Sequence, residues 1–305
     1  MTFNVKCNKE HNDEKEKLVL KLYRKEQEEM KQTRVIYQNK NCYYIKPPLV
    51  LAPYIAHYTF QFGSKGTVES TNQKSRLLTV LPDASGCIVM TYDGNDLSGY
   101  FWGPTTKAVV VGDDRTQVPL RMFIEFMPGG IAQFIRLNQD SVTDLQMPLE
   151  ELSKTLEKDL KVLIEASGSL DEVIKALDTV LFKYFTFINQ TQSNKVTPLL
   201  PYLRQNKGIL TVKDLSEYTF YSPRHLNRLF NESLGINVKT YLRLLRINNA
   251  VKQINSSPKE LTEIAQFLGY YDQAHFIHDF RAVVGVSPKA YRENMSVFYN
   301  ENYKF

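Results

Sequence analysis

Cysteine is scarce in this chain, and its few copies lie far apart. The 305 residues include three cysteines, at Cys7, Cys42 and Cys87. An odd number of dispersed thiols cannot form the disulfide framework of a small secreted protein, nor supply four thiolate ligands to a zinc ion. Cys7 and His11 have the spacing of half a metal site, but no second pair accompanies them. We therefore expect no metal and no cofactor, and thiols that are buried or inert.

Long apolar segments and common catalytic patterns are also missing. No apolar run approaches the roughly 20 residues that span a bilayer. Residues 1–18 lack the apolar core of a secretory signal. We therefore expect a cytoplasmic protein with no membrane partner. No Ser/His/Asp, HExxH or paired-carboxylate pattern stands out in the sequence, so we expect no enzymatic activity.

Positive charge is confined to the last third of the chain. The net charge is +5, and residues 196–305 carry the whole excess, with 14 Lys and Arg against 9 Asp and Glu. The first 195 residues have 24 of each sign and are neutral. A chain of this length can form two domains, each with its own core. A basic module carried by a neutral partner domain is typical of nucleic-acid binding.

The neutral part is predicted to be β-rich between two helical segments. Residues 1–41 are expected to form a helical arm, because residues 12–34 are dense in Glu and Lys. This arm fits a solvated surface helix or a partly disordered arm, and a dimer contact or a lid on the next domain is the functional alternative. From residue 42 to 145, short β-branched and aromatic runs alternate with turn signals, which predicts an antiparallel sandwich or barrel. Leucines at helical spacing then predict a helical hairpin over residues 148–188, which completes a domain of residues 42–190.

Residues 214–291 contain one helical pattern twice. The landmarks that recur fifty residues apart are Leu226 and Phe276, Phe230 and Phe280, and Gly235 and Gly285. In each copy two short helices flank a turn, at Phe220-Tyr221 in the first and at Gly269 in the second. Ser222 and Asp272 are the expected N-caps of the second helices. With a joining helix over residues 238–254, this predicts an all-α tandem helix-turn-helix domain over residues 196–295, and a tail over 296–305.

The second helix of each unit has a polar face that can read bases. With the apolar residues turned inward, the outward residues are Arg224, Asn227, Arg228 and Asn231 in the first unit and Gln273, His275, His278 and Asp279 in the second. Arginine can bond the O6/N7 edge of guanine, and Asn or Gln the N6/N7 edge of adenine. If both helices enter the major groove of double-stranded DNA on adjacent turns, they lie about 34 Å apart. The alternative is that these faces are only solvated.

In this region the chain resembles regulators of the AraC/XylS family. Residues 264–292, IAQFLGYYDQAHFIHDFRAVVGVSPKAYR, contain the family's Ile-Ala, Gly-aromatic, Phe-x3-Phe, Gly-x-Ser-Pro and Tyr-Arg elements. The resemblance covers residues 210–292. It implies a sequence-specific DNA-binding transcriptional regulator, an activator, with RNA polymerase as a partner. Carried over by position, the DNA-reading residues are Arg224, Asn227, Arg228, Gln273, Ala274, His275 and His278.

Two residues depart from the family pattern. Phe220 stands where a turn glycine is usual, which predicts a distorted first turn. His278 stands where arginine is frequent, and imidazole is largely neutral at pH 7. We therefore predict unequal roles for the two units, with the first supplying most of the base-specific energy.

The N-terminal half resembles a sensor-like domain found in a subset of AraC-type regulators. The similar motifs are Leu81-Pro82-Asp83, Gly103-Pro104 and Phe126-x-Pro128-Gly129-Gly130, within about residues 43–185. The resemblance implies an α+β two-domain protein whose cupin-like N-terminal domain senses a small-molecule effector or forms a homodimer. Tyr58, Tyr100 and Trp102, with Phe60 and Phe101, are candidates to line a ligand pocket, and plain core is their alternative role. Control by a protein partner or by dimerisation alone is the alternative to ligand sensing.

Overall fold

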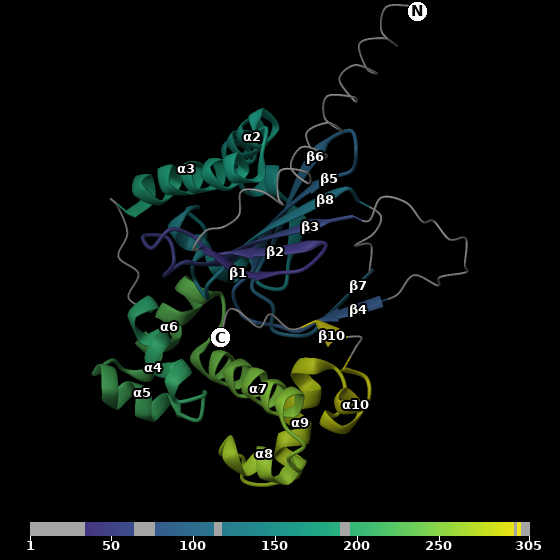
Figure 1. Cartoon of the computed structure of the whole chain (residues 1–305). Coiled ribbons are helices and arrows are strands. Elements are labelled where there is room, and N and C mark those ends of the chain that lie inside the picture. The colour runs from purple at the N-terminus through teal and green to yellow at the C-terminus, as the bar shows by residue number, and fades with distance from the viewer. Residues whose placement is uncertain (1–33, 64–76, 113–117, 190–195, 296–297, 300–305) are drawn as a thin grey trace, which may run out of the picture.

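The computed structural model describes residues 34–63, 77–112, 118–189, 196–295 and 298–299. These residues form a β-rich N-terminal part under two long helices, and a C-terminal part made of short helices (Figure 1). The α+β architecture expected from the sequence is confirmed. The predicted helix over residues 12–34 lies outside the described residues except for Arg34. Among the described helices, none is long and apolar enough to cross a membrane.

Seven strands form the larger sheet, and every neighbouring pair in it is antiparallel. In spatial order they are β1 (Val35–Gln38), β2 (Cys42–Ile45), β3 (Ile55–Phe62), β8 (Leu120–Phe126), β5 (Cys87–Tyr92), β6 (Leu97–Trp102) and β9 (Gln146–Pro148). The expected helical arm over residues 1–41 is therefore wrong at its end. Val35-Ile36-Tyr37 is a β-branched and aromatic run that pairs with β2.

A smaller sheet contains β4 (Leu77–Val80), β7 (Val109–Gly112) and β10 (Phe298–Tyr299). Strands β4 and β7 are antiparallel, whereas β10 lies parallel to β4, with Phe298 opposite Thr79. Two residues of the expected tail over 296–305 are therefore a strand. The backbone that follows the C-terminal helices returns to pair with the N-terminal part.

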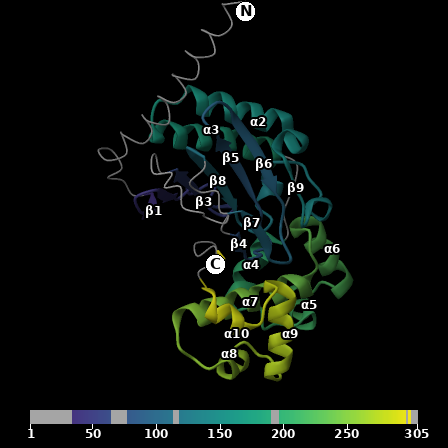
Figure 2. The same ribbon diagram turned by 90° about the vertical axis from the view of Figure 1, so that its right-hand side faces the viewer.

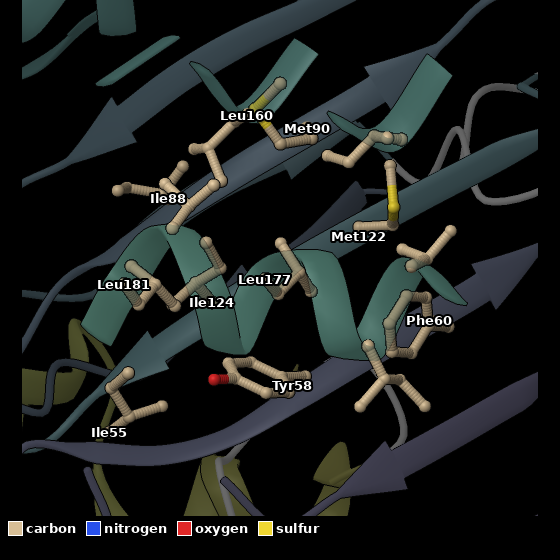
Figure 3. Packing of buried hydrophobic residues seen from close by; sticks show 14 of the residues in the cluster. Ile55, Tyr58, Phe60, Ile88, Met90, Met122, Ile124, Leu160, Leu177 and Leu181 are labelled. Carbon is tan, nitrogen blue, oxygen red and sulfur yellow. The ribbon is translucent and has the colours of Figure 1, made fainter. Parts of the chain in front are cut away.

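The main core lies between one face of the larger sheet and helices α2 (Leu149–Ala166) and α3 (Leu170–Asn189). Alternate residues of each strand point into it, as the two-residue period of a strand requires. Figure 3 shows this packing, with Leu160, Leu177 and Leu181 of the helices over side chains of the sheet, which are Ile55, Tyr58, Phe60, Ile88, Met90, Met122 and Ile124. The predicted helical hairpin packs on the sheet.

The C-terminal helices are α4 (Leu200–Gln205), α5 (Val212–Thr219), α6 (Pro223–Leu234), α7 (Val238–Ser256), α8 (Leu261–Phe267), α9 (Gln273–Val284) and α10 (Pro288–Glu293). Three 3-10 turns, η1 (Ile131–Gln133), η2 (Gln139–Val142) and η3 (Thr197–Leu199), connect other elements. The predicted N-caps are confirmed, because Ser222 accepts from His225 N and Asp272 from His275 N. Leu81 and Ala84 of the N-terminal part are buried in the same core as these helices. The two parts therefore share a packed interface.

Candidate nucleic-acid interface

The repeat of the sequence becomes two helix-turn-helix units joined by α7. In the first unit α5 is followed by α6, and in the second α8 is followed by α9. Leu226 and Phe230 bury one face of α6, and Phe276 and Phe280 bury the matching face of α9. Both helices end at a glycine in the left-handed conformation, Gly235 at φ 74° and Gly285 at φ 85°. The same spacing of apolar residues and cap therefore orients the opposite face of each helix outward.

Six of the seven predicted reading residues are exposed. They are Arg224, Arg228, Gln273, Ala274, His275 and His278. Arg228 Nη2 lies 3.3 Å from His225 Nδ1, and Arg228 Nη1 lies 3.7 Å from Glu232 Oε1. An exposed ion pair of this kind contributes little to stability, so a base could displace Glu232 at small cost.

Asn227, the seventh predicted reading residue, is only half-buried and has a structural partner. Its Oδ1 accepts a hydrogen bond of 3.2 Å from Val238 N, the first amide of α7. Helix N-termini have amides with no partner inside the helix, so this bond ties α6 to the start of α7. A bidentate contact to adenine needs the same oxygen, and would have to break this bond.

Asp279 is not outward, as the sequence pattern had led us to expect. Only 8% of Asp279 is exposed, because α7 packs against this side of α9. Its carboxylate lies 4.0 Å from Arg243 of α7, 3.9 Å from His275 and 4.0 Å from His278. A negative charge therefore lies directly beneath the two histidines of the second reading face. Burial also raises the pKa of the neighbouring Tyr270, which keeps that phenol neutral.

The first turn contains a strained residue. Phe220 has φ 58° and ψ 17°, which is left-handed, and 94% of its side chain is exposed. Gly269 has φ 72° in the second turn, so Phe220 takes the backbone conformation that glycine usually supplies. The turn forms at Phe220-Tyr221, with one residue fewer than in the second unit before the N-cap.

We predict that Phe220→Gly raises the free energy of unfolding by about 0.5–1 kcal/mol, since it relieves left-handed strain and loses no buried contact. Chemical denaturation of the full chain measures the change. Tyr271→Gly is the matched control, because Tyr271 is 95% exposed before the other recognition helix and is not among the described residues with positive φ. The control should be neutral or destabilising. A loss of stability in Phe220→Gly would contradict the assignment of strain.

Two lysines that the sequence reasoning passed over occupy matching places beside the reading faces. Lys239 and Lys289 are fifty residues apart, both are exposed, and each is the second residue of the helix after a recognition helix. Asn237 and Ser287 cap these helices by accepting from Thr240 N and Ala290 N. The fifty-residue repeat contains this signal, because the pattern of cap, apolar residue and lysine recurs in both copies.

A cavity of about 690 Å³ lies between the larger sheet and the smaller one. Tyr100 and Trp102 of β6 line it together with the charged side chains of Asp83, Arg121 and Glu125. Strands β4 and β7 form the opposite wall through Leu78, Val80, Val110 and Val111. A volume of this size falls within the range of sites for small organic ligands.

The five aromatic candidates for the pocket separate onto two faces of the sheet. Tyr100 and Trp102 face the cavity, whereas Phe101 between them is fully buried in the main core, as strand alternation requires. Phe60 also lies in that core. Tyr58 is a correction to our expectation, because it lies on the helix-facing side, where its hydroxyl donates to Asp178 Oδ1 at 3.0 Å. Arg34 Nη1 pairs with the same carboxylate at 2.6 Å.

Comparison with known proteins places the C-terminal helices in a family. A model described as a helix-turn-helix domain matches residues 215–294. The transcriptional activator AarP of Providencia stuartii is 29% identical over 104 residues, which span 34% of this chain and 77% of AarP. RafR, the raffinose operon transcriptional regulatory protein of Pediococcus pentosaceus, is 25% identical over 256 residues, which span 80% of this chain and 86% of RafR.

Among solved structures, the C-terminal domain of AraT, a response regulator from Geobacillus stearothermophilus, is 30% identical. The match covers 32% of this chain and 87% of that domain, with a TM-score of 0.30. The family model spans both repeated units, and the sequence relatives are transcriptional regulators rather than enzymes. The chain therefore belongs to the AraC/XylS family of DNA-binding transcriptional regulators, with its helix-turn-helix domain at residues 215–294.

Proposed function

We propose that this regulator is an activator that reads one site on duplex DNA with α6 and α9, under the control of a small molecule bound in its N-terminal part. The observation that carries the proposal is the pair of recognition helices with exposed polar faces on one scaffold, beside a separate cavity of about 690 Å³. The similarity to AarP, which is named an activator, supports activation and with it a contact to RNA polymerase. A cytoplasmic location and a homodimer belong to the same proposal.

In the proposed complex, α6 and α9 enter the major groove on two adjacent turns. Arg224, Arg228 and Gln273 bond base edges, since their side chains are exposed. The arginines can donate to the O6/N7 edge of guanine, and Gln273 can donate to and accept from the N6/N7 edge of adenine. Lys239 and Lys289 contact the phosphates beside each groove and set the register of the protein without reading sequence. Residues 196–295 are then the reading domain, and residues 42–190 are the sensing domain.

The cavity fits a polyhydroxylated ligand best. Tyr100 and Trp102 provide flat apolar surfaces against which a sugar ring can stack. Gln61, Arg121 and Glu125 provide hydrogen-bonding groups of both kinds on the same wall. The name of RafR, whose match extends over both parts of this chain, supports a carbohydrate as the class of effector.

We predict that one member of a panel of mono- and oligosaccharides raises the melting temperature of the full chain. A ligand at about 100 times its Kd adds about 2.7 kcal/mol to the stability of the state that binds it. Tyr100→Ala should abolish the shift. Tyr37→Ala is the matched control, because Tyr37 and Tyr100 are both 42% exposed and Tyr37 does not line the cavity. No shift across the panel, or an equal loss in both variants, would favour control by a protein partner or by dimerisation.

A further inference from the structure

Two loops of the N-terminal part reach the same end of both recognition helices. We call residues 103–108 and 139–146 together the clamp. Thr143 Oγ1 donates to the carbonyl oxygen of Gly235 at 3.0 Å, at the end of α6. Ala108 N donates to the carbonyl oxygen of Val283 at 2.8 Å, in the last turn of α9. Carbonyls at helix ends have no partner within the helix, so the clamp donates a hydrogen bond to a carbonyl at the C-terminal end of the recognition helix in each unit. Figure 2 shows the segment that leads into β9 beside α6.

The two loops of the clamp are joined mainly through Asp144. Its Oδ1 accepts from Thr106 N and its Oδ2 from Thr106 Oγ1, both at 2.7 Å. Asp144 N in turn donates to Pro104 O at 2.8 Å, and Gly103 N donates to Leu145 O at 2.9 Å. Asp144 takes a left-handed backbone conformation, with φ 59°, to make these contacts. The Asp144 carboxylate therefore accepts two of these four hydrogen bonds between the loops.

The clamp is also continuous with the wall of the cavity. Gly103, Thr105 and Gln146 of the clamp line the cavity, and Trp102 lines it directly before the first loop begins. A third attachment lies nearby, where Asn248 Nδ2 of α7 donates to Pro82 O at 3.0 Å, between the cavity-lining residues Leu81 and Asp83. Every one of these contacts to the helix-turn-helix domain thus starts from a segment that lines the cavity.

We propose that the clamp fixes the separation and relative orientation of α6 and α9, with Asp144 as its principal positioning residue. It holds both helices at their C-terminal ends and leaves Arg224, Gln273 and His275 near the N-terminal ends exposed. The clamped arrangement is therefore the one that binds two half-sites at a set spacing. The connection to the cavity rests on the proposed effector site, whereas the positioning of the helices does not.

The test uses the full chain with the variant Asp144→Gly. Glycine accepts the left-handed backbone without strain, so the substitution removes the two side-chain bonds to Thr106 and little else. Asp140→Ala removes the same charge from an exposed position of the same loop and serves as the control. Thr143→Val is a second variant of nearly equal shape, which removes the hydroxyl donor that the carbonyl oxygens of Gly235 and Gln139 share. Circular dichroism and melting curves establish that all variants are folded.

Affinity is measured on a duplex selected from a random pool by the wild-type chain, and on versions with the half-sites moved closer or apart by about one base pair. We expect Asp144→Gly and Thr143→Val to bind the selected duplex about three- to tenfold more weakly, the effect of a lost hydrogen bond. We also expect the penalty for altered spacing to shrink. Wild-type affinity and spacing penalty in both variants, or tighter binding by either, would overturn the proposal.

Trp102 provides a readout of the connection to the cavity without any effector. It is the one tryptophan of the chain, so intrinsic emission reports on the wall beside the clamp. By reciprocity, DNA that biases the clamp must bias the cavity wall. The selected duplex should change the Trp102 emission of the wild-type chain but not that of Asp144→Gly. A random duplex is the control. Equal changes in both proteins would overturn the connection. If no saccharide shifts the melting temperature but the clamp variants still reduce the penalty for altered spacing, the effector site is wrong and the clamp stands.

Discussion

Gly235→Ala is expected to lower the free energy of unfolding by about 2–4 kcal/mol, while Gly285→Ala at the equivalent position of the second unit lowers it by about 1 kcal/mol. Both glycines end a recognition helix, with φ 74° and φ 85°. A side chain at either position meets the same penalty for a left-handed backbone. The difference between the two variants therefore isolates what surrounds them.

The surroundings differ because only Gly235 faces the clamp. An added Cβ at Gly235 would overlap Thr143 Oγ1 and would lie 2.6 Å from the backbone oxygen of Gln139. Gln139 is fully buried, so its backbone has little freedom to retreat. At Gly285 nothing lies within 4 Å of the added atom. Overpacking of this kind typically costs about 1–3 kcal/mol in addition to the backbone strain.

Urea denaturation followed by circular dichroism and by Trp102 emission measures both losses. The two probes separate unfolding of the helices from changes beside the cavity. Thr143→Ala combined with Gly235→Ala should recover part of the loss, because it removes one of the two overlapping atoms. Equal losses for Gly235→Ala and Gly285→Ala would mean that the clamp does not rest on α6 in solution.

Arg228→Ala is expected to weaken binding to the selected duplex by about 1–3 kcal/mol, which is the contribution of one bidentate contact to guanine. Arg228 is 62% exposed at the side chain, and its contacts are the exposed pair with Glu232 and the contact of 3.3 Å with His225 Nδ1. The guanidinium is therefore available at little cost. Arg224→Ala is expected to behave in the same way, since Arg224 lies near the start of α6 and is exposed.

Variants of Asn227 and of the second unit are expected to weaken DNA binding less than the two arginine variants. Asn227→Ala should lower stability by about 1 kcal/mol through its bond to Val238 N, with a smaller effect on base preference. His275→Ala and His278→Ala should each affect binding less than the arginine variants. Asp279 lies within 4.0 Å of both histidines, so its negative charge offsets part of any positive charge on that face.

Binding is measured by fluorescence anisotropy on selected and random duplexes at several salt concentrations. A phosphate contact weakens binding to both duplexes and reduces the salt dependence, whereas a base contact weakens binding to the selected duplex alone. Equal losses of Arg228→Ala on both duplexes would make Arg228 a phosphate contact. Larger losses for the histidine variants than for the arginine variants would reverse the predicted ranking of the two units.

Local periodicity predicted the secondary structure well because each element is specified by its own residues. Ser222 and Asp272 cap α6 and α9 where a short polar side chain precedes an apolar helical pattern. The strands of the larger sheet follow β-branched and aromatic runs between turns. The prediction of a helical arm over residues 1–41 failed at its end because the β-branched run at Val35 is short beside the charged sequence before it. The sequence also does not show that this run pairs with β2.

The position of a site residue could be predicted from the sequence only where its own helix or strand determines whether the side chain is exposed. Exposure of Arg224 and Arg228 follows from the apolar face of α6 alone. Burial of Asp279 and the bond of Asn227 depend on α7, which the pattern of α6 or α9 does not contain. Alternation along β6 separates Tyr100 and Trp102 from Phe101, but it does not say which face holds the cavity and which the helices. Tyr58 was misplaced for that reason.

By itself, the sequence determined that this protein has two helix-turn-helix units on a shared helix after a β-rich domain, because these features depend on residue spacing within one segment. Only the tertiary structure decided that β10 returns to the smaller sheet, that a cavity separates the two sheets, and that one clamp reaches both recognition helices. These contacts join residues distant in the chain, through backbone groups and loop positions that carry no periodic signal. Their geometry depends on how the finished elements pack.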